Sequence, residues 1–166
     1  MSALDAELMA RAGEVVAANA TAGRRLVLAE SCTGGLVAAA ITAVPGCSAV
    51  FEGGFVTYAD EAKRGWLGVG DDVLDTFGAV SIATAWALAR GALARSGADV
   101  AVSITGVAGP GGGSPAKPVG TVAFGRALRD VDEVYTDLKQ YGDLGRDEVR
   151  RQAALCALEL LIPPAL

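Results

Sequence analysis

Short apolar runs alternate along this chain with longer segments whose apolar residues recur at helical spacing. Two of the runs, Leu26 to Ala29 and Val100 to Ile104, are nearly apolar throughout, which is typical of strands buried on both faces of a sheet. Strands of this kind with helices between them predict helices packed on both faces of the sheet. We therefore expect an α/β fold: a three-layer α/β/α domain with a mixed, mostly parallel sheet and an antiparallel hairpin in the C-terminal half.

The apolar spacing and the breaker residues predict the following elements. Helices are expected over residues 3–22, 33–44, 81–96 and 147–161, with a short helix capped by Asp60 that runs through Lys63 and Trp66. Strands are expected over residues 26–29, 51–58, 100–104, 120–128 and 131–139. The last two strands would form a hairpin that turns at Arg129-Asp130, and Ser81 would cap its helix. The stretch from Trp66 to about Gly78 has no predicted element.

Length, charge and cysteine content narrow the class of protein. At 166 residues the chain is most simply one domain, residues 1–166. The formal net charge is −5, and the sequence contains no block of like charges. Both features argue against nucleic acid or an anionic membrane as partner. Three cysteines without CxxC spacing predict neither a disulfide framework nor a zinc site. With no signal peptide and no membrane-spanning apolar run, we expect a cytoplasmic protein.

The chain contains no histidine. Ser-His-Asp and Cys-His catalysis are therefore excluded within one chain, as are metal sites that need histidine. Any activated nucleophile must use a different base.

Two nucleophilic side chains, Ser31 and Cys32, lie side by side where the first apolar run ends. Thr33-Gly34-Gly35 follow at the start of the expected helix, whose unpaired N–H groups and dipole suit an oxyanion hole or a phosphate seat. The alternative is structural, because Ser and Thr are preferred helix caps and glycine allows tight packing. The local pattern alone favours this structural alternative. For Cys32 we expect a small packed side chain.

Lysine is the natural replacement for histidine as the base of a serine nucleophile. Lys139 belongs to an expected strand end, and Lys117 lies in Ser114-Pro115-Ala116-Lys117, an S-x-x-K match that works only on a helix. Glycines precede that match and Pro118 follows it, so we discount it. Lys63 starts a helix just after Tyr58, where the helix dipole would lower its pKa. The alternative for both Lys63 and Tyr58 is an ordinary solvated side chain.

Polar residues follow three of the expected strands, at Ser31, Tyr58 and Thr105. Ligands of open α/β sheets bind beyond the carboxyl ends of strands, so these residues are expected to meet at one rim. The loop from Thr105 to Gly120 lacks nucleotide-binding motifs, but its glycines can form an anion-binding nest. Three arginines open the last helix and could hold a phosphate or carboxylate: Arg146, Arg150 and Arg151. For Arg151 we expect a solvated charged face instead.

An ordered set of motifs resembles the CinA C-terminal domain family over nearly the whole chain, from about Leu4 to Leu160. It comprises AESCTGGLVAAAIT, VPGCSAVFEGGFVTYADEAKRGWLGV, GAVS, VAVSITGVAGPGGGSPAKPVGTV and the GD…RDEVRRQA ending. Single-domain members of the family include bacterial nicotinamide mononucleotide deamidases. The resemblance implies an amidohydrolase of pyridine nucleotide salvage that uses no metal or cofactor. Its substrate would be a pyridine mononucleotide.

The resemblance also implies a Ser-Lys mechanism, with roles for individual residues. Ser31 matches the nucleophile, Lys63 the base, and Tyr58 a residue that orients the lysine or the substrate. Thr33, Gly34 and Gly35 match the oxyanion segment, and Thr105, Gly106 and Gly109 match the substrate loop. Arg146 matches the arginine of the ending, although Leu144-Gly145 separate it here from Gly142-Asp143, which directly precede it in the family.

Two classes of function remain open at this point. The first is carboxamide hydrolysis through an acyl-enzyme on Ser31. The second is a non-catalytic nucleotide-binding or protein-interaction module, in which Thr33-Gly34-Gly35 only seat an anion. A phosphotransferase is disfavoured because no P-loop lysine is present. The apolar hairpin and helices favour a homo-oligomer in either case.

Overall fold

The computed structural model describes residues 4–164, which form one five-stranded sheet covered by helices. The strands are β1 (Leu26–Glu30), β2 (Phe51–Val56), β3 (Val100–Gly106), β4 (Thr121–Leu128) and β5 (Tyr135–Gln140). The helices are α1 (Ala6–Ala22), α2 (Leu36–Thr42), α3 (Asp60–Leu67), α4 (Asp71–Phe77), α5 (Ile82–Ala94) and α6 (Arg146–Leu161), with a 3-10 turn η1 (Cys47–Ala49). Within residues 4–164, no helix is long and apolar enough to cross a membrane.

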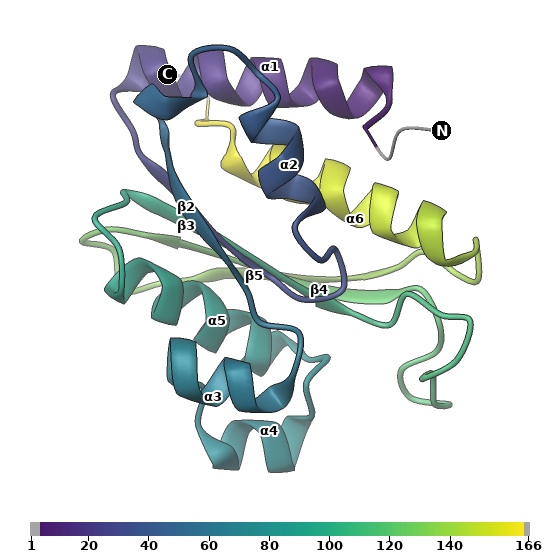
Figure 1. Cartoon of the computed structure of the whole chain (residues 1–166). Helices are drawn as coiled ribbons and strands as arrows, with labels where there is room; N and C mark the ends of the chain where they lie inside the picture. Colours follow the sequence, from purple (N-terminus) through teal and green to yellow (C-terminus); the bar gives the residue numbers. More distant parts are fainter. Residues whose placement is uncertain (1–3, 165–166) are drawn as a thin grey trace.

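The sheet has the mixed topology expected from the sequence, in the order β2-β1-β3-β4-β5. β1 pairs in parallel with β2 and β3, whereas β3, β4 and β5 pair antiparallel. Helices α1, α2 and α6 cover one face and α3, α4 and α5 lie on the other, as Figure 1 shows. The predicted three layers are therefore confirmed. β1 is buried at all five positions because it lies between β2 and β3 and is covered on both faces.

Glycines let α5 approach its neighbours closely. A Cβ at Gly125 in β4 would lie 2.6 Å from the carbonyl oxygen of Ala85, and one at Gly91 would lie 2.1 Å from that of Leu67. Both distances are shorter than real contacts, so side chains there would push α5 away from the sheet and from α3. This close packing holds α5 against the sheet, and it holds α3, which carries Lys63, against α5.

Several predicted helix boundaries are wrong. The helix expected over residues 33–44 runs only from Leu36 to Thr42, because Thr33, Gly34 and Gly35 form a turn before it. The helix expected to begin at residue 3 begins at Ala6, with Asp5 as its N-cap; residue 3 itself lies outside the described residues. Asp60 does not cap its helix, since Ala59 holds that position.

The later elements also differ at their ends. Ser81 caps α5 as predicted and accepts the N–H of Thr84, but the helix ends at Ala94. The expected two-residue hairpin turn is wrong: residues 129–134 connect the strands, and β5 begins only at Tyr135. Helix α4 and the turn η1 were not predicted. β2 stops at Val56, before Thr57 and Tyr58, whereas β3 continues through Thr105 to Gly106.

Candidate active site

Ser31 lies in a tight turn directly after β1. Its N–H donates to the carbonyl of Ile104 on neighbouring β3 at 2.9 Å, and its own carbonyl accepts the N–H of Gly34 at 3.0 Å. Ser31 is buried, with only 8% of the residue exposed. The turn at the end of β1 therefore holds the hydroxyl of Ser31 in a defined position.

Glu30 occupies the N-terminus of α2. Its carboxylate is 1% exposed and accepts three backbone N–H groups, from Gly35 at 3.0 Å, Val37 at 3.2 Å and Ala38 at 2.8 Å. A carboxylate at this place satisfies the unpaired donors of the helix and matches its dipole. Of the segment expected to hold an oxyanion or phosphate, Thr33-Gly34-Gly35, the N–H of Gly35 is therefore already bonded to a carboxylate of the same chain.

Arg150 on α6 supports the same turn from the other side. Its Nε donates to the carbonyl of Cys32 at 3.1 Å and its Nη2 to that of Thr33 at 3.0 Å. The sequence suggested a clamp for a substrate anion at this position. The structure instead shows a guanidinium that holds backbone carbonyls, while Arg151 pairs with Asp5, Glu7 and Glu148.

Lys63 reaches Ser31 from α3. The lysine is 1% exposed, and its Nζ lies 3.2 Å from Ser31 Oγ, 2.9 Å from the carbonyl of Thr57 and 3.0 Å from that of Tyr58. Both carbonyls are available because β2 has already ended. Burial lowers the pKa of Lys63 below its usual 10.5, and the carboxylate of Asp60, 3.8 Å from Nζ, opposes this effect. The cause is thus desolvation, where the sequence suggested the helix dipole.

This geometry suits a neutral lysine that accepts a proton from serine. An uncharged amine has two N–H bonds, which match the two carbonyls of Thr57 and Tyr58, and one lone pair, which is left for the hydroxyl of Ser31. After protonation the third N–H can donate back to Ser31 Oγ. The same three neighbours therefore accommodate both protonation states of the amine.

Ser31 and Lys63 open into a cavity of about 270 Å³ at the carboxyl ends of β1 and β3. Seven of the ten predicted site residues line it: Ser31, Tyr58, Lys63, Thr105, Gly106, Gly109 and Arg146. Thr33, Gly34 and Gly35 do not line it, and the N–H groups of Gly34 and Gly35 donate to Ser31 and Glu30. The residues at the strand ends therefore meet at one rim as expected, but the segment expected to hold the oxyanion lies outside the cavity.

Arg146 links two walls of this cavity. Its Nη1 donates to the carbonyl of Gly109 at 2.7 Å and its Nη2 to the hydroxyl of Tyr58 at 2.8 Å. The guanidinium is exposed, which leaves it within reach of an anion. Despite the insertion of Leu144-Gly145, Arg146 lies at the cavity and is the first residue of α6. Thr105 is buried and donates its hydroxyl to the carbonyl of Ala79 at 2.7 Å, which ties β3 to the segment before α5.

The thiol of Cys32 is a poor nucleophile in this setting. Burial raises its pKa to about 12, so the thiolate is scarce at neutral pH. The residue is 4% exposed and belongs to the hydrophobic core between the sheet and α2, as expected for a small packed side chain.

Sequence reasoning missed two acidic residues of the site. Asp60 lines the cavity and lies three residues before Lys63 on the same helix, a spacing that brings side chains together. For Glu30, the second of these residues, the sequence predicted no role. A carboxylate a few residues before a predicted helix start was the available signal for its role.

Comparisons with known proteins agree on one family. The model of the CinA C-terminal domain matches residues 9–163. A nicotinamide-nucleotide amidohydrolase PncC of Enterobacter agglomerans is 50% identical over 147 residues, which cover 88% of each chain. A CinA-like protein of Akkermansia muciniphila is 59% identical over 113 residues, 68% of this chain, and the match spans only 27% of that relative's length.

A solved structure agrees in fold as well as in sequence. The crystal structure of the competence/damage inducible protein CihA from Agrobacterium tumefaciens superposes with a TM-score of 0.93 at 48% identity, covering 98% of both chains. The family model, the relatives and this structure together show that the chain belongs to the CinA C-terminal domain family.

Proposed function

We propose that the chain hydrolyses the carboxamide of nicotinamide mononucleotide to nicotinic acid mononucleotide and ammonia, with Ser31 as the nucleophile and Lys63 as the base. The observation that carries the proposal is the distance of 3.2 Å between Lys63 Nζ and Ser31 Oγ, both in one cavity. The relative from Enterobacter agglomerans, a nicotinamide-nucleotide amidohydrolase that is 50% identical to this chain, supports the choice of substrate.

Acylation begins with Lys63. Its neutral amine takes the hydroxyl proton of Ser31 while Oγ attacks the carboxamide carbon and the carbonyl becomes an oxyanion. The oxyanion then re-forms the carbonyl as the C–N bond breaks. The Lys63 ammonium gives its proton to the departing nitrogen, which leaves as ammonia. An ester between Ser31 and the nicotinoyl group remains.

Deacylation repeats these steps with water. Lys63 takes a proton from a water molecule as the water oxygen attacks the ester carbonyl. The C–O bond to Ser31 breaks, and the Lys63 ammonium returns the proton to Oγ. The product is a carboxylic acid, which loses its proton to the solvent to become the carboxylate, and Ser31 and neutral Lys63 are regenerated. One water is consumed for each ammonia released.

The rest of the cavity would orient the substrate. Since the N–H groups of Gly34 and Gly35 already donate hydrogen bonds within the chain, we place the oxyanion donors on the glycine-rich loop from Thr105 to Gly120. There, the backbone N–H groups of Ala108 and Gly109 donate to no acceptor within residues 4–164. The exposed guanidinium of Arg146 at the rim would attract the 5′-phosphate.

An ammonia-release assay with purified protein and nicotinamide mononucleotide tests the proposal. Ser31→Ala and Lys63→Met should each lower kcat by about 100-fold or more, because the nucleophile or the base is lost. The matched controls are Ser96→Ala and Lys139→Met, which remove the same groups outside the cavity and should keep the wild-type rate.

Two outcomes would overturn this mechanism. Wild-type rates for Ser31→Ala or Lys63→Met would show that the reaction does not need the replaced nucleophile or base. Substrate-induced thermal stabilisation of the wild-type chain without ammonia release would instead favour a non-catalytic nucleotide-binding module.

A further inference from the structure

β5 is an edge strand, and no strand within residues 4–164 pairs with its outer side. It pairs with β4 alone and ends the sheet order. The N–H of Leu138 donates to the side chain of the preceding residue, Asp137, at 2.8 Å, which shows that it points away from β4. An edge of this kind is a template for pairing with another strand.

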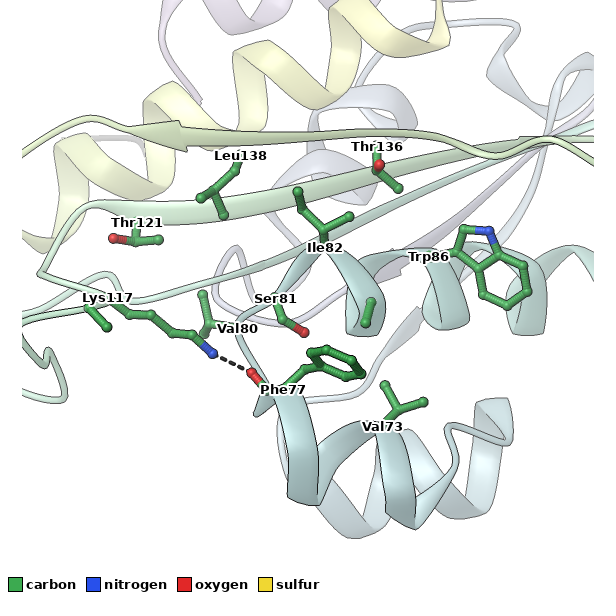
Figure 2. Close-up of a pocket in the computed structure, with 12 residues that line it drawn as sticks. Val73, Phe77, Val80, Ser81, Ile82, Trp86, Lys117, Thr121, Thr136 and Leu138 are labelled. Atoms are coloured by element: carbon green, nitrogen blue, oxygen red, sulfur yellow. Dashed lines mark hydrogen bonds between the residues drawn. The ribbon is translucent and has the colours of Figure 1, made fainter.

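A large apolar surface adjoins this edge. Phe77, Ile82, Trp86 and Leu138 surround a cavity of about 650 Å³ between β5, α4 and α5 (Figure 2). Leu138 is 41% exposed and Phe77 52%, which is high for side chains of this size. Exposed apolar surface beside an unpaired strand is typical of a protein–protein contact.

The charges of β5 complement those of a second β5 in one register. If two copies pair antiparallel about Leu138, Asp137 faces Lys139 of the partner subunit, and the reverse contact forms by symmetry. Centring the pair on Asp137 or Lys139 would instead place like charges opposite each other. Within one chain Asp137 and Lys139 already form an ion pair of 2.8 Å, so both lie on the same side of the strand.

We propose that two copies of this chain join their β5 strands antiparallel about Leu138 and form one continuous sheet. The Leu138 residues exchange two backbone hydrogen bonds, in which the partner's carbonyl replaces the Asp137 side chain as acceptor. The apolar side chains around the cavity of Figure 2 cover each other across the two-fold axis. The contact lies at the opposite edge of the sheet from β2, so it does not depend on the proposed reaction.

Sedimentation of the whole chain over the micromolar range tests this interface by charge exchange. The wild-type chain should be a dimer. Asp137→Lys alone and Lys139→Asp alone should each weaken it by about tenfold, because symmetry creates two like-charge contacts. The double variant Asp137→Lys/Lys139→Asp should restore the wild-type dimer, because opposite charges again face each other.

Glu14→Lys serves as the matched control. It breaks another exposed 2.8 Å ion pair, with Arg11 on α1, and should leave the dimer unchanged. A wild-type chain that stays monomeric throughout this range would overturn the proposal. The charged side chains of β5 would then serve to prevent pairing at this edge. A dimer that the single reversals do not weaken, or that the double variant does not restore, would place the interface elsewhere.

Discussion

Glu30→Gln tests whether the buried carboxylate holds the Ser31 turn. Glutamine keeps the size of the side chain but replaces one acceptor oxygen with an NH₂ donor. If its oxygen takes the place of Oε2, the bonds to Gly35 and Val37 remain and that to Ala38 is lost; the other orientation loses two bonds. The better orientation therefore costs one buried, charge-assisted bond.

A hydrogen bond to a buried charged group contributes roughly 1.5–3 kcal/mol, and the favourable charge at the helix N-terminus is lost as well. We expect Glu30→Gln to lower the free energy of unfolding by about 2–3 kcal/mol. For a domain of this size that lowers Tm by roughly 5–10 °C.

Thermal denaturation and steady-state kinetics measure the two consequences. The turn that carries Ser31 loses support, so kcat should fall more than KM changes when the folded variant is assayed well below its Tm. The control is Glu14→Gln, a surface glutamate on α1 whose replacement should be nearly neutral. Wild-type Tm together with wild-type kcat in Glu30→Gln would refute the role assigned to the carboxylate.

Three further predictions concern other groups of the site. Because burial lowers the pKa of Lys63, kcat/KM should rise with pH through that lowered pKa. The unfolded chain binds more protons between the lowered pKa and about 10.5, so the free energy of unfolding should also rise with pH in this window. The slope is at most about 1.4 kcal/mol per pH unit, and a urea-unfolding series should show no such component in Lys63→Met. Arg146→Ala should raise KM for the mononucleotide about tenfold or more, with a smaller change in kcat, because it frees Gly109 and Tyr58 and removes the rim cation; a larger loss in kcat than in KM would argue for a role in the chemical step. A thiol reagent at neutral pH should label Cys47 before Cys32, whose pKa burial raises to about 12, and peptide mass spectrometry would reveal the opposite order.

The layers of the fold could be predicted because the patterns behind them are local. The apolar runs at Leu26 and Val100 report burial on both faces, and the cap at Ser81 depends on a contact only three residues away. Helix α4 was missed because it is one short helix of seven residues, preceded by Gly70 and followed by Gly78, with no capping side chain. A glycine-bounded stretch of this length carries little helical signal.

The sequence predicted only those site residues whose location follows from where a strand ends. Ser31, Tyr58 and Thr105 met at one rim because each follows or ends a strand of the same sheet. The occupation of the α2 N-terminus by Glu30 and the contacts of Arg150 depend on how the turn folds back. Arg150 lies 117 residues after Thr33 in the sequence. No local pattern therefore tells whether its guanidinium binds the carbonyl of Thr33 or a substrate anion.

The central claim, that Ser31 becomes acylated with Lys63 as its base, is tested most directly by trapping the covalent intermediate. The wild-type enzyme would be mixed with nicotinamide mononucleotide, quenched in acid during turnover, digested and analysed by mass spectrometry. We predict a nicotinoyl-mononucleotide adduct on the Ser31 hydroxyl that is absent from Ser31→Ala and Lys63→Met. Turnover with no adduct on any peptide, or an adduct on the neighbouring Cys32, would contradict the account.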